Sequence, residues 1–360
     1  MGLVLKDVDK YVGQEIHLKD INLELEPGKR YVLLGRTLAG KTSLLRIMAG
    51  LDRPSNGSVI MNDVDVTGMS VRKRSVAMVY QQFINYPSLS VFKNIASPLK
   101  IAGTSRAEIK RRVQEAAKML HIEHLLDRLP SELSGGQQQR CAIARALVKR
   151  VELLLLDEPL VNLDYKLREE LREELQQIFE RRESIVVYTT TEPTEALMLG
   201  GETIVMHEGR VLQTGPTAEV YLNPATTKVA EVFSDPPINF VPAVIEDGNV
   251  RIGKGQVIPQ QGRLADLEPG EYRFGMRSNR LFLKGQEGRT VRFDGTVGLS
   301  EINGSETFVH MTYEDVPLVA QEVGVHQYGV GDEVSVFLDP NDFYVFGESG
   351  NLLVSPVRAD

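Results

Sequence analysis

The sequence predicts an α/β domain built on a central parallel sheet, followed by a smaller all-β domain. Over the first two thirds of the chain, short apolar runs alternate with stretches of helical periodicity, the pattern of a parallel sheet covered by helices. A glycine-bearing loop joins one such run to a helix. After about residue 235, short alternating strands separated by Gly, Asn and Asp turns replace the helices. We therefore expect an α/β domain over residues 1–235 and a barrel-like β domain over 236–360.

The bulk composition limits the class of protein. The chain has 360 residues, of which 42% are apolar and 25% charged, as in soluble globular proteins of two domains. Its net charge of −8 argues against a general nucleic-acid binder, so we expect no nucleic-acid partner. The lone Cys141 cannot form an internal disulfide, and the charged N-terminus lacks the apolar core of a signal peptide. No run reaches the roughly 18 apolar residues that cross a bilayer. We expect a cytosolic chain, with any membrane span supplied by another subunit.

The predicted elements follow an order that places the loops. Residues 1–30 alternate apolar and polar side chains and predict an antiparallel β region ending in a Pro-Gly turn. Tyr31–Leu34 predicts a buried strand, and the helix that follows the next loop stops at Gly50. The block over about 85–150 is helical and indicates a subdomain inserted into the α/β architecture.

The loop Gly35–Thr42, with the sequence GRTLAGKT, matches the pattern G-x-x-x-x-G-K-[ST]. Glycines let backbone N–H groups approach phosphate oxygens, and the helix N-terminus adds positive potential. Lys41 can reach the β- and γ-phosphates, and the Thr42 hydroxyl can ligate Mg²⁺. We therefore expect an ATP and Mg²⁺ site, whose remaining loop residues are Arg36, Thr37, Leu38, Ala39, Gly40 and the following Ser43.

The apolar run VELLLLDEP predicts a buried strand that ends in Asp157 and Glu158. Parallel strands present their carboxyl ends at the edge of the sheet where α/β folds bind ligands. Asp157 can hold the metal, directly or through water, and Glu158 can polarise the attacking water of a phosphoryl transfer. The alternative, that the two acids only cap the following turn, is weakened by the phosphate loop upstream.

The segment LSGGQQQR starts a helix with an unusual cap. Ser134 is followed three residues later by Gln137, which is the pattern of a capping box. Gly135 and Gly136 leave the backbone exposed at the helix start, because glycine has no side chain. The pattern predicts a second anion-binding helix end, although a plain helix cap remains the alternative.

With GRTLAGKT, VYQQ, LSGGQQQR, LLLLDEP and VNLD in this order, the chain closely resembles the nucleotide-binding subunits of ATP-binding-cassette (ABC) transporters. The resemblance covers essentially the whole length. DINLELEPGK, LLRIMAGLDRPSNGSV and the stretch from NPAT to PPINF resemble bacterial importers of sugars, polyols and glycerol phosphate. The terminal β domain is similar to the OB-like regulatory domain of that maltose-importer-like group.

The resemblance implies roles for several further residues. Gln81 of VYQQ would contact Mg²⁺ or water and sense the membrane subunit, and Phe83–Leu89 would form part of the socket for that subunit. Asp164 of VNLD would lie at the seam of a cassette dimer. In this family two cassettes enclose two ATP molecules, each held by one chain's phosphate loop and the other chain's LSGGQ segment. The implied partners are a second cassette, two integral membrane permease subunits and, indirectly, a periplasmic or extracellular substrate-binding protein.

Residues near the loop depart from the family pattern. Leu38 stands where the group usually has a small residue or glycine, and Arg36 stands where it has proline. A tolerated loop residue and an altered phosphate cradle both remain open. The aromatic residue that stacks on adenine usually precedes a glycine near the N-terminus, but Val12 stands there, before Gly13, with Tyr11 beside it. Either Tyr11 stacks on the base or apolar contact holds it, and we favour Tyr11.

The sharpest departure lies after the strand IVVYTT, where the family has a histidine that touches the γ-phosphate. Thr191 occupies that position, and a threonine hydroxyl is shorter than an imidazole and cannot carry positive charge. No other histidine lies near that motif in the sequence. We therefore expect the site on this chain's own loop to be slow or non-hydrolysing. Because LSGGQ is intact, the chain could complete an active site with a different cassette, as a heterodimer.

The leading hypothesis is the ATPase subunit of a membrane importer for a sugar, glycerol or related polyol, peripheral at the cytoplasmic face of the inner membrane. One alternative is a soluble, non-transport ABC ATPase, and another is a regulatory cassette that binds ATP with little hydrolysis. The sequence has one cassette and no heptad repeats, which disfavours the first alternative, while Lys41, Asp157 and Glu158 disfavour the second.

Overall fold

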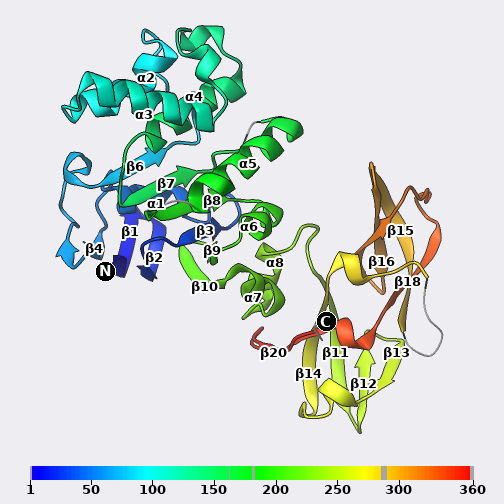
Figure 1. Cartoon of the computed structure of the whole chain (residues 1–360). Coiled ribbons are helices and arrows are strands. Elements are labelled where there is room, and N and C mark those ends of the chain that lie inside the picture. Colours follow the sequence, from blue (N-terminus) through cyan, green and yellow to red (C-terminus); the bar gives the residue numbers. More distant parts are fainter. Residues whose placement is uncertain (1, 162, 181–182, 285–289, 357–360) are drawn as a thin grey trace. The chain divides into compact units, whose positions relative to one another are not determined.

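The computed structural model describes the chain except residues 1, 162, 181–182, 285–289 and 357–360 (Figure 1). It forms two compact units, residues 1–217 and 218–360. The proline-rich joint DPPINFVP, after which no long helix is expected, predicts a boundary near residue 235. The structure instead groups most of helix α7 (Thr217–Leu222) and all of α8 (Thr227–Val232) with the C-terminal strands.

The first unit is organised by a mostly parallel sheet with the strand order β10-β9-β3-β8-β7-β6. Strands β7 and β8 are buried along their whole length, as expected for a sheet covered on both faces. The parallel pairing β3·β8 and β8·β7 brings the ends of these strands to one edge. The bounds are β3 (Arg30–Leu34), β6 (Val76–Val79), β7 (Leu153–Asp157), β8 (Ile185–Thr190), β9 (Glu202–His207) and β10 (Arg210–Pro216).

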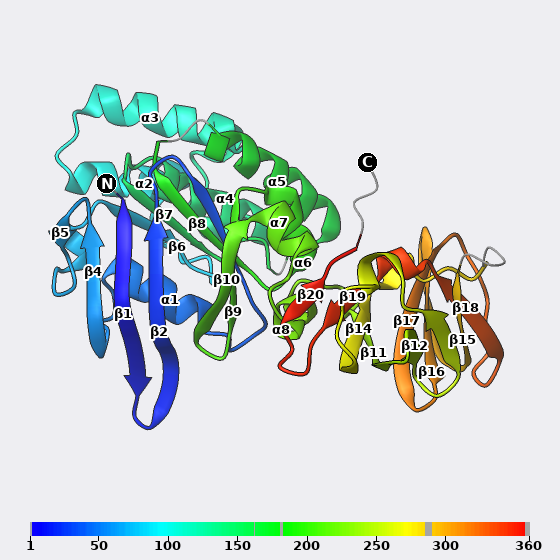
Figure 2. The same ribbon diagram turned by 90° about the horizontal axis from the view of Figure 1, so that it is seen from below.

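An antiparallel sheet of order β2-β1-β4-β5 forms the N-terminal β region, with β4, β1 and β2 side by side in Figure 2. Helix α1 (Lys41–Ala49) packs in one apolar core with side chains of this sheet and of the parallel sheet. The expected antiparallel region and parallel sheet are thus confirmed. The bounds are β1 (Leu3–Val12), β2 (Glu15–Leu25), β4 (Asn56–Met61) and β5 (Val64–Asp65).

The segment between β6 and β7 is helical and contains α2 (Val91–Ile101), α3 (Arg106–Met119) and α4 (Gly135–Leu147), which cluster at the top of Figure 1. Each of these helices starts at a serine whose hydroxyl accepts a backbone N–H of the first turn: Ser90, Ser105 and Ser134. Helices α5 (Tyr165–Glu180) and α6 (Pro193–Leu199) follow β7 and β8 respectively. Within the described part of the chain, no helix is long and apolar enough to cross a bilayer.

The strands of the second unit form an OB-like β domain in which two antiparallel sheets share one apolar core. Asn239 joins the sheets, because its amide accepts from the backbone N–H of Val319 and donates to the Val319 carbonyl at 2.7 and 2.9 Å. One sheet has the order β13-β12-β11-β14-β19-β20 and the other β17-β16-β15-β18. The bounds are β11 (Asn239–Glu246), β12 (Asn249–Ile252), β13 (Gln256–Pro259), β14 (Gly270–Met276), β15 (Val291–Asn303), β16 (Glu306–Tyr313), β17 (Val316–Val323), β18 (Glu333–Leu338), β19 (Tyr344–Phe346) and β20 (Leu352–Val354).

Buried Arg277, just after β14, explains why α7 and α8 belong to this unit. Its guanidinium donates to the carbonyls of Tyr221 and Phe233 at 2.6 and 3.1 Å, and to the Ser234 hydroxyl at 2.7 Å. It also lies 3.7 Å from the centre of the Tyr221 ring. No carboxylate in the described residues pairs with Arg277, so two carbonyls, the hydroxyls of Ser234 and Tyr344, and aromatic faces stabilise the charge.

We predict that Arg277→Met lowers the unfolding free energy of the C-terminal unit by on the order of 2–4 kcal/mol, because several buried acceptors lose their donor together. The measurement is calorimetric unfolding of the full chain. Arg251→Met is the matched control, since half-exposed Arg251 pairs with half-exposed Glu246 and its loss should cost under about 0.5 kcal/mol. Equal, small effects of the two substitutions would contradict the role assigned to Arg277.

Candidate nucleotide site

The loop Gly35–Thr42 leaves the carboxyl end of β3 and opens α1, the arrangement the sequence predicted. Two glycines are required by close backbone approach: a Cβ on Gly35 would lie 2.7 Å from the Met206 carbonyl oxygen, and one on Gly40 2.8 Å from that of His17. Gly40 also has a φ of 98°. Leu38 adopts a φ of 68° with a side chain that is 94% exposed. It therefore points to solvent rather than filling the loop.

Lys41 is the central cation of the site. It is only 4% exposed, and its Nζ lies 2.7 Å from the Gly35 carbonyl, 3.2 Å from that of Arg36 and 3.1 Å from Glu158 Oε1. A buried ammonium that curls back into its own loop suits a phosphate cradle, because the loop N–H groups and the helix start face the same space.

The carboxylates at the end of β7 complete the cluster. Asp157 Oδ1 accepts from the Thr42 hydroxyl at 3.1 Å and from the Thr189 hydroxyl at 3.0 Å. Burial raises the pKa of Asp157, with a further rise from the charge of Glu158, while the two hydroxyl bonds lower it. A hydroxyl beside a carboxylate supplies the oxygen ligands that Mg²⁺ prefers, so these residues fit the metal.

The side chains of Glu158 and Gln81 are hydrogen-bonded although the two residues are far apart in the sequence. Gln81 Nε2 donates to Glu158 Oε2 at 3.2 Å, and the backbone N–H of Glu158 donates to the Thr189 hydroxyl at 2.9 Å. Glu158 has a φ of 43°, a strained value for a residue with a side chain. The predicted catalytic and metal-binding residues Thr42, Gln81, Asp157 and Glu158 thus form one cluster with Lys41.

Other predicted residues lie apart from this cluster in the described structure. The capping box is present, with Ser134 N donating to Gln137 Oε1 at 3.1 Å and Gln137 N to Ser134 Oγ at 3.4 Å. A Cβ on Gly136 would lie 1.9 Å from Leu167 Cδ2, whereas Gly135 has open space around it. No described hydrogen bond or ion pair joins the Ser134–Gln137 segment to the phosphate loop.

Asp164 lies at the start of a helix, and Thr191 lies at the end of a strand. Asp164 Oδ1 accepts from the Leu167 N–H at 3.0 Å and so caps α5, while its neighbour Asn162 lies outside the described residues. Thr191 follows β8 directly and is half-buried. It forms no hydrogen bond among the described residues, unlike Thr190, whose hydroxyl donates to Glu195 at 2.7 Å and accepts from the Glu192 N–H at 3.0 Å.

Sequence reasoning missed two residues of the site. Thr189 bridges Asp157 and the Glu158 backbone; its place two residues before Thr191, at the end of a buried strand, was the available signal. His17 lies on β2 with Nδ1 3.3 Å from the Ser43 hydroxyl. Nothing in the local sequence indicates that contact, because it depends on how the β region packs on α1.

These features define a P-loop nucleotide-binding cassette that carries a second, OB-like domain. A model of the family described as "ABC transporter" matches residues 18–161. The chain belongs to the ABC transporter family, as an ATP-binding subunit whose ATP hydrolysis is coupled to transport and which binds ATP with Mg²⁺.

Relatives match over nearly the full length. The sn-glycerol-3-phosphate import ATP-binding protein UgpC 3 of Agrobacterium fabrum is 35% identical, covering 97% of this chain and 98% of that protein. The trehalose/maltose import ATP-binding protein MalK of Thermococcus litoralis is 36% identical over the same shares. Among solved structures, the dimeric cassette MJ0796 bound to ADP and Pi is 31% identical with a TM-score of 0.54, covering 60% of this chain and 98% of its own. These similarities confirm the predicted family.

We predict that Asp157→Asn raises the thermal midpoint of the nucleotide-free chain at neutral pH and abolishes the effect of Mg²⁺ on nucleotide affinity. Because the pKa of Asp157 is raised in the folded chain, the folded state binds this proton more tightly than the unfolded state does. The contribution of Asp157 to stability therefore falls as the pH rises above the ordinary pKa of an aspartate. Asparagine removes that cost at neutral pH yet can still accept the two hydroxyl bonds. The gain should shrink below about pH 4, where the wild-type carboxyl is itself protonated.

Thermal unfolding across pH, with titration calorimetry with and without Mg²⁺, measures both effects. Asp339→Asn is the control, because Asp339 lies in the C-terminal unit, where its side chain accepts from the Asn341 N–H at 2.8 Å, and asparagine keeps that acceptor and should change neither. A lowered midpoint at neutral pH together with an unchanged Mg²⁺ effect would refute the prediction.

Proposed function

We propose that this chain is the ATP-binding and hydrolysing subunit of a membrane importer for a sugar, glycerol or a related polyol. The observation that carries the proposal is the cluster of Lys41, Glu158 and Gln81 beside the Asp157–Thr42 pair. The names of relatives, which specify glycerol phosphate, trehalose or maltose, and alpha-glucosides, support the cargo class. As a peripheral subunit, the chain works at the cytoplasmic face of the membrane.

Each residue of the cluster has a distinct task in hydrolysis. Lys41 and the loop N–H groups bind and orient the terminal phosphates, and Glu158 orients the attacking water and accepts its proton. Mg²⁺, held by Thr42, Asp157 and Gln81, supplies charge neutralisation when bound. Gln81 contacts Glu158 directly, so a movement of the segment after β6 reaches the carboxylate.

The surface next to Gln81 suits a permease subunit. The loop Phe83–Leu89 is held by buried Asn94, whose amide bonds the backbone of Tyr86 and the Leu89 carbonyl. Tyr86 and Ile101 are exposed, Ile101 at 87%, beside a cleft of about 200 Å³. A rigid loop next to exposed apolar side chains is what a docked helix of a membrane partner requires.

ATP binding would bring this chain together with a second cassette. In the closed dimer, Ser134–Gln137 of one chain completes the site on the other chain's loop, and Asp164 lies near the seam. Closure and reopening then move the docked permease subunits between inward and outward states, and a substrate-binding protein delivers the cargo from outside. The capping box uses the N–H of Gln137, whose partner is the Ser134 hydroxyl, so the N–H groups of Gly135 and Gly136 are the ones that a phosphate would accept from at the start of α4.

The site on this chain's own loop is proposed to turn ATP over slowly, and the second cassette to be a different protein. Thr191 cannot supply the cation that a histidine would place by the γ-phosphate. The neighbouring segment is braced, since Glu192 pairs with Arg168 of α5 at 2.9 Å and Thr190 bonds Glu195. An ordered segment around the neutral Thr191 favours the binding of ATP over its hydrolysis.

We expect the isolated chain to hydrolyse ATP slowly and Thr191→His to raise its turnover by roughly 10- to 100-fold, because a histidine restores a charged or proton-transferring group. Steady-state phosphate release from the full chain measures the effect. Glu158→Gln in the Thr191→His background is the control and should abolish the gain. Robust turnover of the unmodified homodimer that Glu158→Gln abolishes would refute both the weak site and the need for a different partner.

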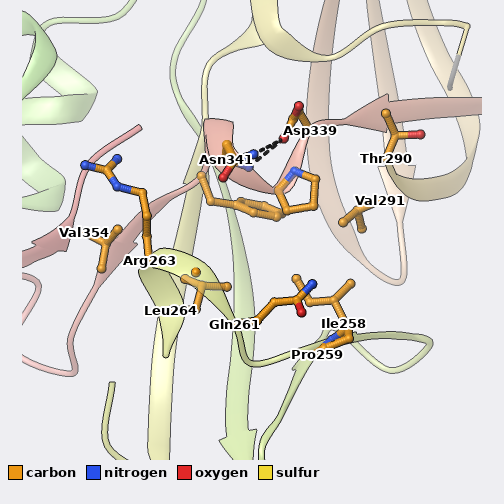
Figure 3. A pocket seen from close by; sticks show the side chains of 13 residues that line it. Ile258, Pro259, Gln261, Arg263, Leu264, Thr290, Val291, Asp339, Asn341 and Val354 are labelled. Atoms are coloured by element: carbon orange, nitrogen blue, oxygen red, sulfur yellow. Dashed lines mark hydrogen bonds between the residues drawn. The ribbon is translucent and has the colours of Figure 1, made fainter. Parts of the chain in front are cut away.

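The C-terminal unit is proposed to be regulatory. Between β13 and the end of β18 it contains a cleft of about 570 Å³, within the size range of small-molecule sites. Figure 3 shows Ile258, Leu264 and Val291 along its walls, with Arg263 and Gln261 as polar neighbours. An effector that binds there could report cell state to the cassette.

Two other functions are separable by experiment. A soluble, non-transport ATPase would not co-purify with an integral membrane protein, whereas an importer subunit would. A regulatory cassette with little hydrolysis would fail to trap nucleotide with vanadate in the assembled complex. Capture of a permease together with vanadate trapping favours the importer over both.

A further inference from the structure

A buried hydroxyl near the end of β8 lies between the two acids at the end of β7. Thr189 is the last residue but one of β8, is 0% exposed, and stands opposite Asp157 in the parallel register. Its Oγ1 lies 3.0 Å from Asp157 Oδ1 and 2.9 Å from the backbone nitrogen of Glu158. One side chain thus reaches both the predicted metal ligand and the predicted catalytic residue.

The two contacts determine where the proton of this hydroxyl points. The backbone nitrogen of Glu158 can only donate, so Thr189 Oγ1 accepts that N–H through a lone pair. The single proton of the hydroxyl is donated to Asp157 Oδ1, which is an acceptor when the carboxyl is ionised. Thr189 therefore accepts from the backbone of one acid and donates to the side chain of the other.

The donated bond restricts the carboxylate of Asp157. Its Oδ1 accepts from two hydroxyls, those of Thr189 and Thr42, at 3.0 and 3.1 Å. Within the described part of the chain, no hydrogen bond or ion pair reaches the other oxygen, Oδ2. Two donors on one oxygen oppose rotation of the carboxylate, and they leave the acceptor capacity of Oδ2 free for a metal ion or a metal-bound water.

The accepted bond holds the backbone of Glu158. This residue has a φ of 43°, a strained value that persists only where surrounding contacts impose it. Its carboxylate is bonded separately, with Oε1 3.1 Å from Lys41 Nζ and Oε2 3.2 Å from Gln81 Nε2. Thr189 holds the N–H end of the same residue, so it fixes the point from which the carboxylate extends.

No other side chain in the described structure bonds both acids. Of the two, Lys41 and Gln81 contact only the glutamate, and Thr42 contacts only the aspartate. Thr189 also lies on β8, the strand between the one that leads into the phosphate loop and the one that ends in the acids. Its hydroxyl is therefore the contact that relates the positions of the two acids to each other.

We propose that Thr189 is a positioning residue for ATP hydrolysis, whose one hydroxyl keeps the metal-binding carboxylate of Asp157 and the water-orienting Glu158 in their working positions. The inference rests on the roles proposed above for these two acids. Thr189 acts through them and needs no contact of its own with ATP. Because one hydroxyl serves both acids, its loss should weaken metal binding and slow hydrolysis together.

A buried threonine also bonds nearby groups simply because buried polar atoms need partners. Thr307 on β16 shows the same pattern in the C-terminal unit: it is 0% exposed, donates to the Gly324 carbonyl at 2.8 Å and accepts from the His326 N–H at 3.0 Å. Thr307→Val is therefore the matched control, since it removes a hydroxyl of equal burial and equal hydrogen bonding far from the two acids in the sequence.

The test compares Thr189→Val, Thr189→Ser and Thr307→Val with wild type, all as the full chain. Valine nearly keeps the shape of threonine and suits a buried strand, whereas serine keeps the hydroxyl and loses the methyl group. Titration calorimetry with a non-hydrolysable ATP analogue, with and without Mg²⁺, gives the gain in affinity due to the metal. Phosphate release gives kcat, and residue-resolved hydrogen exchange of the nucleotide-free chain follows the Glu158 amide.

Thr189→Val should reduce the gain in affinity due to Mg²⁺ about tenfold and kcat about tenfold or more, the size of effect that follows loss of a partner of a metal-binding side chain. Affinity without Mg²⁺ should stay nearly unchanged, and the Glu158 amide should exchange faster. Thr189→Ser should recover most of each loss, and Thr307→Val should match wild type in all three measurements. Turnover is compared as a ratio, so a slow wild type does not prevent the measurement.

Several outcomes overturn the inference. Equal losses in Thr189→Val and Thr189→Ser would assign the effect to the methyl group and not to the hydroxyl. A valine variant that weakens the analogue equally with and without Mg²⁺ would show that Thr189 acts only through packing. Rapid exchange of the Glu158 amide in wild type would refute the accepted bond even where the valine variant does not fold.

The proposed function fails separately. A wild type that binds no nucleotide, or whose binding does not respond to Mg²⁺, would remove the roles of the two acids and the inference with them. A wild type whose binding responds to Mg²⁺, beside a valine variant that responds equally and keeps its kcat, would refute the inference alone.

Discussion

The ion pair of Lys41 and Glu158 is the interaction on which the arrangement of the site depends. A buried ammonium is costly unless it is paired and hydrogen-bonded, and here two loop carbonyls and one carboxylate meet that requirement. Strands β3 and β7 flank β8 in the parallel sheet, so the loop after β3 and the acids after β7 reach the same edge. The pair therefore joins the loop after β3 to the carboxylate after β7 through one cation.

Much of this site can be predicted from short stretches of the sequence. The Gly35–Thr42 pattern, the buried strand that ends in Asp157, and the capping box at Ser134 each follow from a short stretch with its own physical rule, and each is found in the structure. What sequence reasoning missed depends on packing. Strand β1 has irregular pairing around Lys10 and Tyr11, and a shift of one residue there exchanges the faces of neighbouring side chains.

The grouping of α7 and α8 with the C-terminal strands, rather than before the expected boundary near residue 235, also depends on packing. Helical periodicity describes α7 and α8 but cannot say which core they join, and Arg277 decides this from more than forty positions along the chain. Two of its contacts are to the backbone carbonyls of Tyr221 and Phe233, which any residue would offer, so the local sequence does not reveal them. The role of Thr189 could not be predicted for the same reason. A threonine in a buried strand gives no signal by itself, and its contacts with Asp157 and the Glu158 backbone are seen only in the structure.

Two places in this cassette bear on how it uses ATP: the end of β8, and the contact of His17 with the start of α1. At the end of β8, Thr189 and Thr190 bond the carboxylates of Asp157 and Glu195, and Thr191 follows directly with no hydrogen bond among the described residues. On β2, His17 lies beside Ser43 in the first turn of α1. Under the proposal made above, a neutral threonine stands where a histidine would assist hydrolysis, while Lys41 and the loop still bind ATP. Because binding energy that is equal in the ground and transition states does not speed the chemical step, a site of that kind would retain ATP while hydrolysing it slowly. We propose that such a cassette would act as the long-lived half of an ATP-closed dimer, with turnover at the site that its Ser134–Gln137 segment completes.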